Sequence, residues 1–161
     1  AITSGYFPFG AVMLNERIET VFMESGPDGA IGHGYTYSGH PVGCAAALAT
    51  LDVTFGQDLP GNALARGEQL MASLKALQAE HEMIGDVRGK GLMVGIELVA
   101  DRGLKTPLDP QLGDALADRV FAAGAMIRVS GNIIIMSPPL VITESEINSL
   151  AQALSVGFAG A

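Results

Sequence analysis

The spacing of apolar and polar residues predicts three helices in the second part of the chain. In residues 63–81, leucines recur four and three positions apart, so one apolar stripe faces charged residues on the opposite side. Residues 111–123 show apolar residues four apart in the same way. A last helix is predicted after Thr143, because Thr143 and Glu146 form an S/T-x-x-E capping box ahead of an apolar run.

Runs of apolar residues predict strands between these helices, over residues 92–99, 125–129 and 132–137. In the first run the apolar side chains alternate with period two, and Gly95 in its middle indicates a bulge or a close backbone approach. Gly85–Gly91 is expected to turn the chain, and Ser130–Gly131 to join the last two strands. The order helix, strand, helix, strand, strand, helix predicts a small α/β unit.

The first part of the chain is less regular. The apolar run Gly10–Leu14 predicts a strand buried on both faces, and residues 15–24 predict a short helix. A longer helix is predicted over Pro41–Thr54. Proline and glycine interrupt the segment Phe55–Asn62, in which Asn62 is a suitable helix N-cap. We therefore expect a domain boundary here, which divides the chain into residues 1–56 and 57–161.

The amino-acid composition limits which binding partners and which cellular compartment are expected for this protein. The 161 residues are 48% hydrophobic, enough to build a core, and contain no apolar run long enough to span a membrane. A net charge of −8 with scattered lysines and arginines argues against nucleic acid or an anionic membrane as a partner. The first residues lack the features of a signal peptide, and without a methionine they do not resemble a natural start. One cysteine excludes a disulfide framework and favours a reducing cytoplasm.

The segment Gly32–Gly43 reads GHGYTYSGHPVG and leads into an alanine-rich helix. Small residues, hydroxyl groups and the free N–H groups of a helix N-terminus can together bind an anion. The alternative is a plain helix start, in which Ser38 or Gly39 ends the loop and Pro41 occupies the first turn. The spacing alone leaves both interpretations open.

Arg128 is the second candidate for chemistry, since it lies between apolar neighbours on a predicted strand. A buried arginine needs an anionic partner, and its planar fork suits a carboxylate. The alternative is an arginine at a strand end that reaches solvent or pairs with a nearby aspartate. Arg88 raises the same question, but Asp86 beside it offers a structural answer. His33 and His40 lack further ligands at suitable spacing, so a metal site is not expected.

Several segments, taken in chain order, together resemble the class III aminotransferases. They read ITSGYFPFGAVML, HGYTYSGHPVGCAAALATLDV, DVRGKGLMVGIELV and IRVSGNIIIMSPPLVITESEI. This family consists of pyridoxal-phosphate enzymes of fold type I, the aspartate-aminotransferase fold. The sequences of the first two segments are most similar to those of the ω-amino-acid:pyruvate and amine:pyruvate aminotransferase branch.

The resemblance implies that this chain is the C-terminal part of a longer enzyme. Residues 1–56 would end the large cofactor-binding domain, and residues 57–161 would form the small C-terminal α/β domain. In the family, the lysine that forms the Schiff base with the cofactor comes immediately before the segment that starts here at Ala1. The chain itself would then hold no catalytic residue, because none of its lysines lies in the right motif to replace that lysine.

The resemblance also implies roles for individual residues. Thr36 matches the threonine that contacts the phosphate of pyridoxal 5′-phosphate in the other subunit of a homodimer, and Tyr35 would line the same pocket. Arg128 matches the arginine that takes the substrate carboxylate and swings aside for apolar groups. Residues flanking the lysine would be Thr3, Ser4, Tyr6 and Phe7.

The implied reaction moves an amino group from an amine or ω-amino acid to a keto acid such as pyruvate. A decarboxylase or aminomutase of the same fold, and a homologue without catalytic activity, remain as alternatives.

Overall fold

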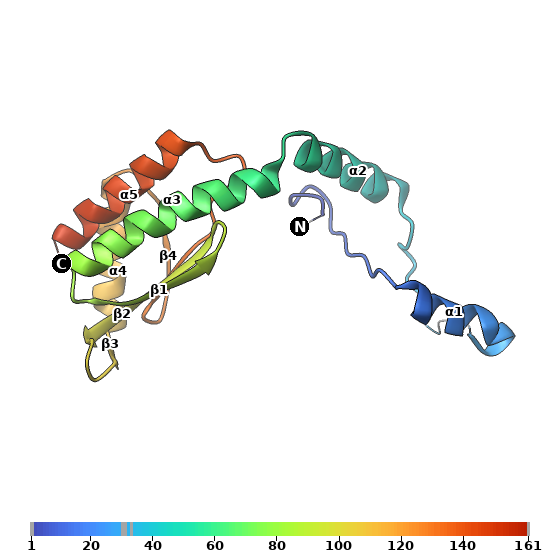
Figure 1. Cartoon of the computed structure of the whole chain (residues 1–161), viewed down its shortest axis with the longest axis horizontal. Helices are drawn as coiled ribbons and strands as arrows, with labels where there is room; N and C mark the ends of the chain where they lie inside the picture. The colour runs from blue at the N-terminus through green and yellow to red at the C-terminus, as the bar shows by residue number, and fades with distance from the viewer. Residues whose placement is uncertain (1, 30–31, 33, 161) are drawn as a thin grey trace. The chain divides into compact units, whose positions relative to one another are not determined.

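The computed structural model describes residues 2–29, 32 and 34–160 (Figure 1). The chain divides into two compact units, Ala1–Gln57 and Asp58–Ala161, which are described separately. The Schiff-base lysine expected before Ala1, and His33, which was weighed as a metal ligand, lie outside the described residues.

The second unit is built on an antiparallel sheet. Its strands are β1 (Ile84–Lys90), β2 (Met93–Asp101), β3 (Thr106–Pro107), β4 (Arg128–Ser130) and β5 (Ile133–Met136). The strand order is β1-β2-β5-β4, and the short β3 pairs with β2. The order differs from the chain order because β5 lies between β2 and β4.

Three helices complete this unit, namely α3 (Leu59–Glu80), α4 (Pro110–Ala122) and α5 (Glu144–Ala159). Figure 1 shows α3 and α5 side by side, and their residues contact each other. One face of the sheet and the three helices share a single core, whose fully buried members include Leu70, Leu74, Ile96, Leu98, Leu116, Ile134, Ile147 and Phe158. This closed core fixes the positions of the sheet residues discussed below.

The predicted turn at Gly85–Gly91 is wrong, because these residues form most of β1. Two glycines hide the strand pattern, yet both are required by the close packing of the hairpin. A Cβ on Gly89 would lie 2.3 Å from the carbonyl oxygen of Met93, and one on Gly85 would lie 2.6 Å from Val99. Gly95 marks neither the bulge nor the close backbone approach that were predicted as alternatives, since its register with β1 and β5 is regular and a Cβ there would lie 3.8 Å from its nearest neighbour, Ile133.

The predicted helices of this unit are confirmed, with one correction at the start of α3. Asp58, and not Asn62, is the N-cap, and its carboxylate accepts a hydrogen bond from the Gly61 N–H at 3.2 Å. Asn62 lies inside the helix, where its side-chain amide donates to the carbonyls of Leu140 and Ile142. The capping box of Thr143 and Glu146 is present as predicted.

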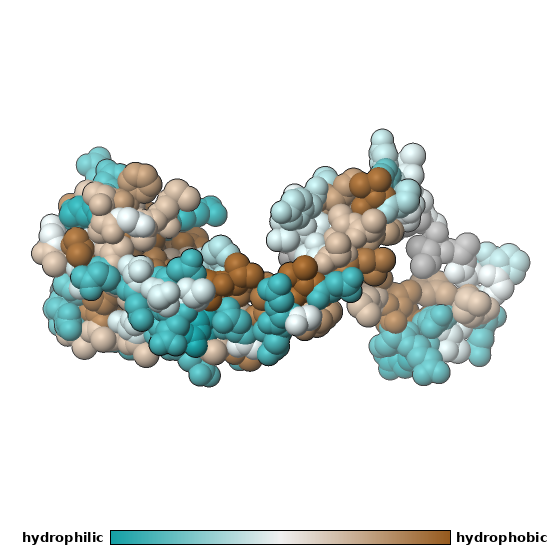
Figure 2. Space-filling view, turned by 90° about the horizontal axis from the view of Figure 1, so that it is seen from above, coloured by the Kyte–Doolittle hydropathy of each residue, from teal (hydrophilic) through white to brown (hydrophobic). Residues whose placement is uncertain are grey.

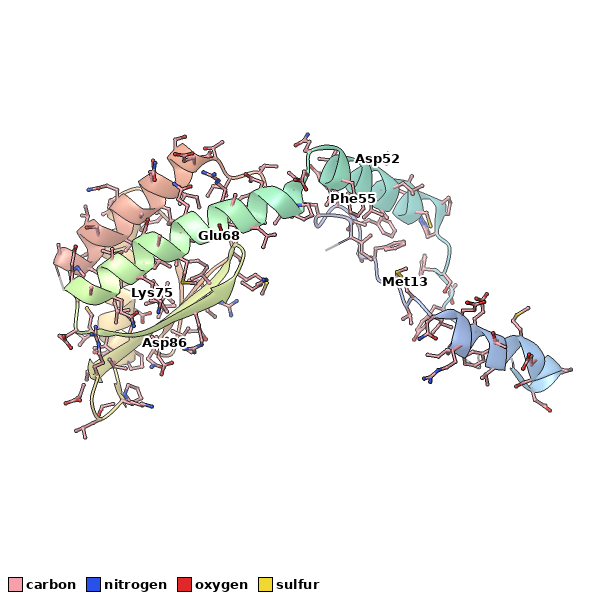
Figure 3. The ribbon with its side chains drawn as sticks, viewed as in Figure 1. Met13, Asp52, Phe55, Glu68, Lys75 and Asp86 are labelled. Atoms are coloured by element: carbon pink, nitrogen blue, oxygen red, sulfur yellow. The ribbon has the colours of Figure 1, made fainter. Side chains whose placement is uncertain are left out.

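The first unit contains α1 (Glu16–Glu24), the short 3₁₀ helix η1 (Gly26–Gly29) and α2 (Pro41–Gly56), so both predicted helices are confirmed. The predicted buried strand Gly10–Leu14 is wrong. Val12 and Met13 are 88% and 94% exposed, and no strand occurs among the described residues of this unit for the run to pair with. Figure 3 labels Met13 on this irregular segment. Figure 2 shows apolar residues exposed on the surface of the first unit.

Candidate functional site

Two successive turns shape the segment that precedes α2. The Ser38 N–H donates to the Tyr35 carbonyl at 3.0 Å, and the His40 N–H donates to the Tyr37 carbonyl at 3.2 Å. Gly39 closes the second turn with φ of +68°, a left-handed conformation that glycine adopts without steric cost. Thr36 is the second residue of the first turn. Its side chain and that of Tyr35 are exposed.

The helix itself begins in a way that the sequence did not reveal. His40 is the N-cap of α2, in place of Ser38 or Gly39, and its Nδ1 accepts a hydrogen bond from the Gly43 N–H at 3.4 Å. Pro41 occupies the first turn as expected. The plain helix start and an anion site are therefore compatible, because the cap comes from His40 and leaves the Thr36 hydroxyl exposed.

These residues fit a phosphate group. An exposed hydroxyl in a tight turn, directly before a helix N-terminus, can donate to an anion that is also attracted by the helix dipole. Tyr35 is 69% exposed beside it and adds a polar wall. Only the phosphate group of pyridoxal phosphate is matched by residues of this chain. The residues that would hold the pyridine ring of the cofactor are not among those predicted here.

The loop Thr3–Phe7 packs against the start of α2. Thr3 is buried, its hydroxyl donates to the Phe7 carbonyl at 2.5 Å, and its own carbonyl accepts from the Tyr6 N–H at 3.0 Å. The Phe7 ring stacks on the His40 ring with centroids 5.1 Å apart. The structure thus joins two predicted segments of the site, the one expected to follow the lysine and the one that carries Thr36.

Arg128 opens β4 in the second unit and is exposed, so of the two alternatives the structure has the arginine at a strand end that reaches solvent and not the buried one. Its strand is short and at the sheet edge. It pairs in register with the partly exposed Ile135, whereas the next pair, Val129 and Ile134, turns toward the core. Arg128 borders a hollow of about 690 Å³. The walls of the hollow are mainly apolar and include Met126, Ile127, Met136, Pro138, Pro139, Ile142 and Leu150.

Arg88 lies in the same row of the sheet as Arg128, because Arg88 pairs with Gly95, Gly95 with Ile135, and Ile135 with Arg128. The two arginines differ in their partners. One guanidinium nitrogen of Arg88 lies 2.9 Å from Asp86 and 2.7 Å from Glu97. Within the described part of the chain, no such carboxylate partner is recorded for Arg128.

Arg88 forms ion pairs with Asp86 and Glu97, which favours the structural interpretation of this arginine. Its hydrogen bond holds the pKa of Asp86 below the ordinary value of 3.8, while Asp86 and Glu97 together raise the pKa of Arg88. The sequence suggested Asp86 as a partner but missed Glu97, because the register of a strand read as a turn cannot be predicted. A guanidinium that already binds two carboxylates has little remaining attraction for a further anion.

Across the residues that the structure describes, no three His, Cys, Asp or Glu side chains gather in a way that could hold a metal ion. In the same residues, no helix has both the length and the apolar character needed to cross a membrane.

The chain was compared with known proteins. The family model for aminotransferase class-III matches residues 1–157. An uncharacterized aminotransferase, y4uB of Sinorhizobium fredii, is 45% identical over an alignment of 157 residues, and the match covers 92% of this chain and 33% of that protein. This chain therefore spans about a third of the length of the relatives that it matches.

Solved structures agree with this match. The amine transaminase of an uncultivated Pseudomonas species, in its pyridoxal-phosphate-bound form, is 45% identical with a TM-score of 0.92, over 99% of this chain and 36% of that one. An (S)-enantioselective omega-transaminase from Thermomicrobium roseum is 37% identical with a TM-score of 0.87, over 99% and 35% of the two chains. The resemblance and the α/β fold class expected from the sequence are confirmed. The chain belongs to the class III aminotransferase family and has the fold of the corresponding part of a fold-type-I transaminase.

Proposed function

We propose that this chain is the C-terminal third of a pyridoxal-phosphate-dependent transaminase that moves an amino group from an amine or ω-amino acid to a keto acid such as pyruvate. The observation that carries the proposal is the 45% identity with an amine transaminase over nearly the whole chain. The first unit would end the large cofactor-binding domain, and the second would be the small C-terminal domain. The protein would act as a cytoplasmic homodimer.

Thr36 and Tyr35 are the residues proposed to hold the cofactor. The Thr36 hydroxyl and the N–H groups of its turn would donate to the phosphate of the partner subunit's cofactor, with Tyr35 alongside. The cofactor, when bound, withdraws electrons from the carbon that bears the amino group. The lysine that moves the proton at that carbon would precede Ala1, so the task of this chain is binding and orientation.

Arg128 is proposed to select the substrate. Its exposed guanidinium would bind a substrate carboxylate in a two-pronged geometry, and the apolar hollow beside it would accept a group without charge. One site could then serve both an ω-amino acid or keto acid and a simple arylalkylamine. This dual recognition would require Arg128 to move aside, which its place on a short edge strand permits.

Replacement of Arg128 tests this role. In the full-length enzyme, Arg128→Gln should lower kcat/KM for carboxylate-bearing donors roughly 10- to 100-fold, since a hydrogen bond to a charged group contributes about 1.5–3 kcal/mol. A carboxylate-free arylalkylamine, assayed with an aldehyde acceptor in place of a keto acid, should lose much less. Arg88→Gln serves as the control, because the loss of a structural arginine affects both donors alike. Equal losses in Arg128→Gln would remove Arg128 from its assigned role.

Replacement of Thr36 tests the phosphate site. In the full-length protein, Thr36→Ala should raise the dissociation constant of pyridoxal phosphate roughly tenfold, because one hydrogen bond to a charged group is lost. Thr36→Ser keeps the hydroxyl and should bind the cofactor nearly as well as the unmodified enzyme. Unchanged cofactor affinity in Thr36→Ala would contradict the assignment.

The alternatives are separated by spectroscopy and product analysis. Full-length protein with bound cofactor should have a visible absorption band that disappears on addition of an amine donor. A protein that stays colourless with added cofactor would be a homologue without catalytic activity. A transaminase consumes a keto acid one-for-one with the amine, which a decarboxylase or aminomutase does not.

A further inference from the structure

His40 makes contacts that the proposed function leaves unexplained. It is half-buried, its main-chain N–H closes the second turn before α2, and its Nδ1 caps the helix. The Nδ1 atom faces the start of the helix, where the Gly43 N–H donates to it at 3.4 Å. His40 therefore ends the second turn, which overlaps the first turn that carries Thr36.

The ring of His40 has a second contact, with Phe7. The two rings are stacked, with centroids 5.1 Å apart and planes 29° apart. Gly43 allows this arrangement, since a Cβ at that position would lie 2.7 Å from the Phe7 ring. Phe7 is thus held between an imidazole and a helix backbone, a geometry that depends on a planar ring at residue 40.

The loop that ends at Phe7 is itself tightly constrained. Ser4 and Gly5 have φ of +50° and +85°, and the Thr3 hydroxyl bonds to the Phe7 carbonyl. A serine in the left-handed region is uncommon and needs support from its surroundings. Because the loop is constrained in this way, a displacement of Phe7 would also displace the residues before it, back to residue 2 and the position where the lysine is expected.

We propose that His40 is a positioning residue, whose ring stacks on Phe7 to hold the loop Thr3–Phe7 in fixed relation to the turn that carries Thr36. This inference rests on the proposed function, in which the loop follows the Schiff-base lysine and the turn binds the cofactor phosphate. The contact between the His40 and Phe7 rings then sets the distance between the loop Thr3–Phe7 and the turn that carries Thr36. The helix cap affects only the stability of α2.

Two variants of the full-length holoenzyme separate the ring from the cap. His40→Asn keeps a good N-cap and loses the ring, whereas His40→Phe keeps a ring and loses the cap. His40→Asn should bind pyridoxal phosphate roughly tenfold more weakly at nearly unchanged thermal stability. His40→Phe should be less stable but keep the cofactor affinity within about twofold. Phe7→Leu should behave like His40→Asn.

The measurement is a titration of each apo variant with pyridoxal phosphate, followed by the visible band, together with a thermal unfolding curve. A purely structural role would make affinity fall in step with stability in every variant. Either that pattern or an unchanged affinity in His40→Asn would overturn the inference while leaving the proposed function intact. Failure of the unmodified full-length protein to bind the cofactor would overturn both.

Discussion

Individual residues decide how closely the elements of the second unit approach. Gly67 lies on α3 where the helix meets the tip of the β1–β2 hairpin, and a Cβ there would lie 2.3 Å from the Gly91 carbonyl oxygen. The obstacle is backbone, which cannot turn aside as a side chain can. An apolar pattern does not reveal such a contact, because it depends on two glycines that are far apart in the sequence.

Gly67→Ala should destabilise the protein by about 1–3 kcal/mol, the usual cost of overpacking. The sign is informative, because alanine in place of glycine inside an exposed helix normally stabilises by about 0.5–1 kcal/mol. Glu68→Ala, at the exposed neighbouring position labelled in Figure 3, is the matched control and should change stability little. Urea unfolding of the full chain measures both. A stabilised Gly67→Ala would mean that the hairpin tip does not contact α3.

At the scale of the elements, the sequence predicted helices better than strands. A helix can be predicted from a short stretch of sequence, because its apolar stripe and its cap lie within that stretch, as in α3 and α5. Strand β1 was missed because glycines break its pattern and its partner lies across a hairpin. For the same reason the sequence named Asp86 but not Glu97 as a partner of Arg88.

The candidate site shows the same division. Thr36, Tyr35 and Arg128 were predicted as site residues from motifs of a few consecutive residues. His40 was missed as a cap and as the partner of Phe7, although a histidine directly before Pro41 at a helix start was a usable signal. The stack between residues 7 and 40 depends on tertiary packing, which no local pattern encodes.

The start of α5 makes the stability of the protein depend on acidity. Glu146 accepts hydrogen bonds from the Thr143 N–H and hydroxyl, and these bonds hold the pKa of Glu146 below its ordinary value of 4.5. A carboxyl whose pKa is lower in the folded state stabilises the fold fully above 4.5, and this contribution is lost as the pH falls through the folded value.

Glu146→Gln should therefore flatten the decline in stability of the full chain below pH 4.5, because the amide does not titrate over this range. Urea unfolding at a series of pH values provides the measurement. Glu68→Gln removes an exposed carboxylate from α3 and should leave the slope nearly unchanged. Identical pH profiles for Glu146→Gln and the unmodified chain would contradict the capping role.

At the scale of the whole molecule, the two units differ in how completely they bury their own residues. The second unit encloses one continuous core. Among the described residues of the first unit only Thr3, Gly43 and Ala47 are buried, and α1 buries none. The sequence, at 48% hydrophobic, predicted ample material for a core but not this uneven division.

Residues 58–161 expressed alone should therefore fold, with a cooperative urea transition and dispersed amide resonances in a proton–nitrogen spectrum. Residues 1–57 alone should show neither, because so little apolar surface is buried within them. A structureless 58–161 fragment would mean that its core depends on contacts from the rest of the protein.

The strand order β1-β2-β5-β4 also has a consequence for synthesis on the ribosome. Within the second unit, residues 58–101 leave the ribosome first. They can form α3 and the β1–β2 hairpin, because these elements are neighbours in the sequence. The residues of β2 that pair with β5, residues 94–97, lack this partner until β5 has left the exit tunnel, after α4 and β4. During that interval the nascent chain presents an open strand edge beside the apolar face of Val94, Ile96 and Leu98, which is the arrangement most prone to pairing with another chain.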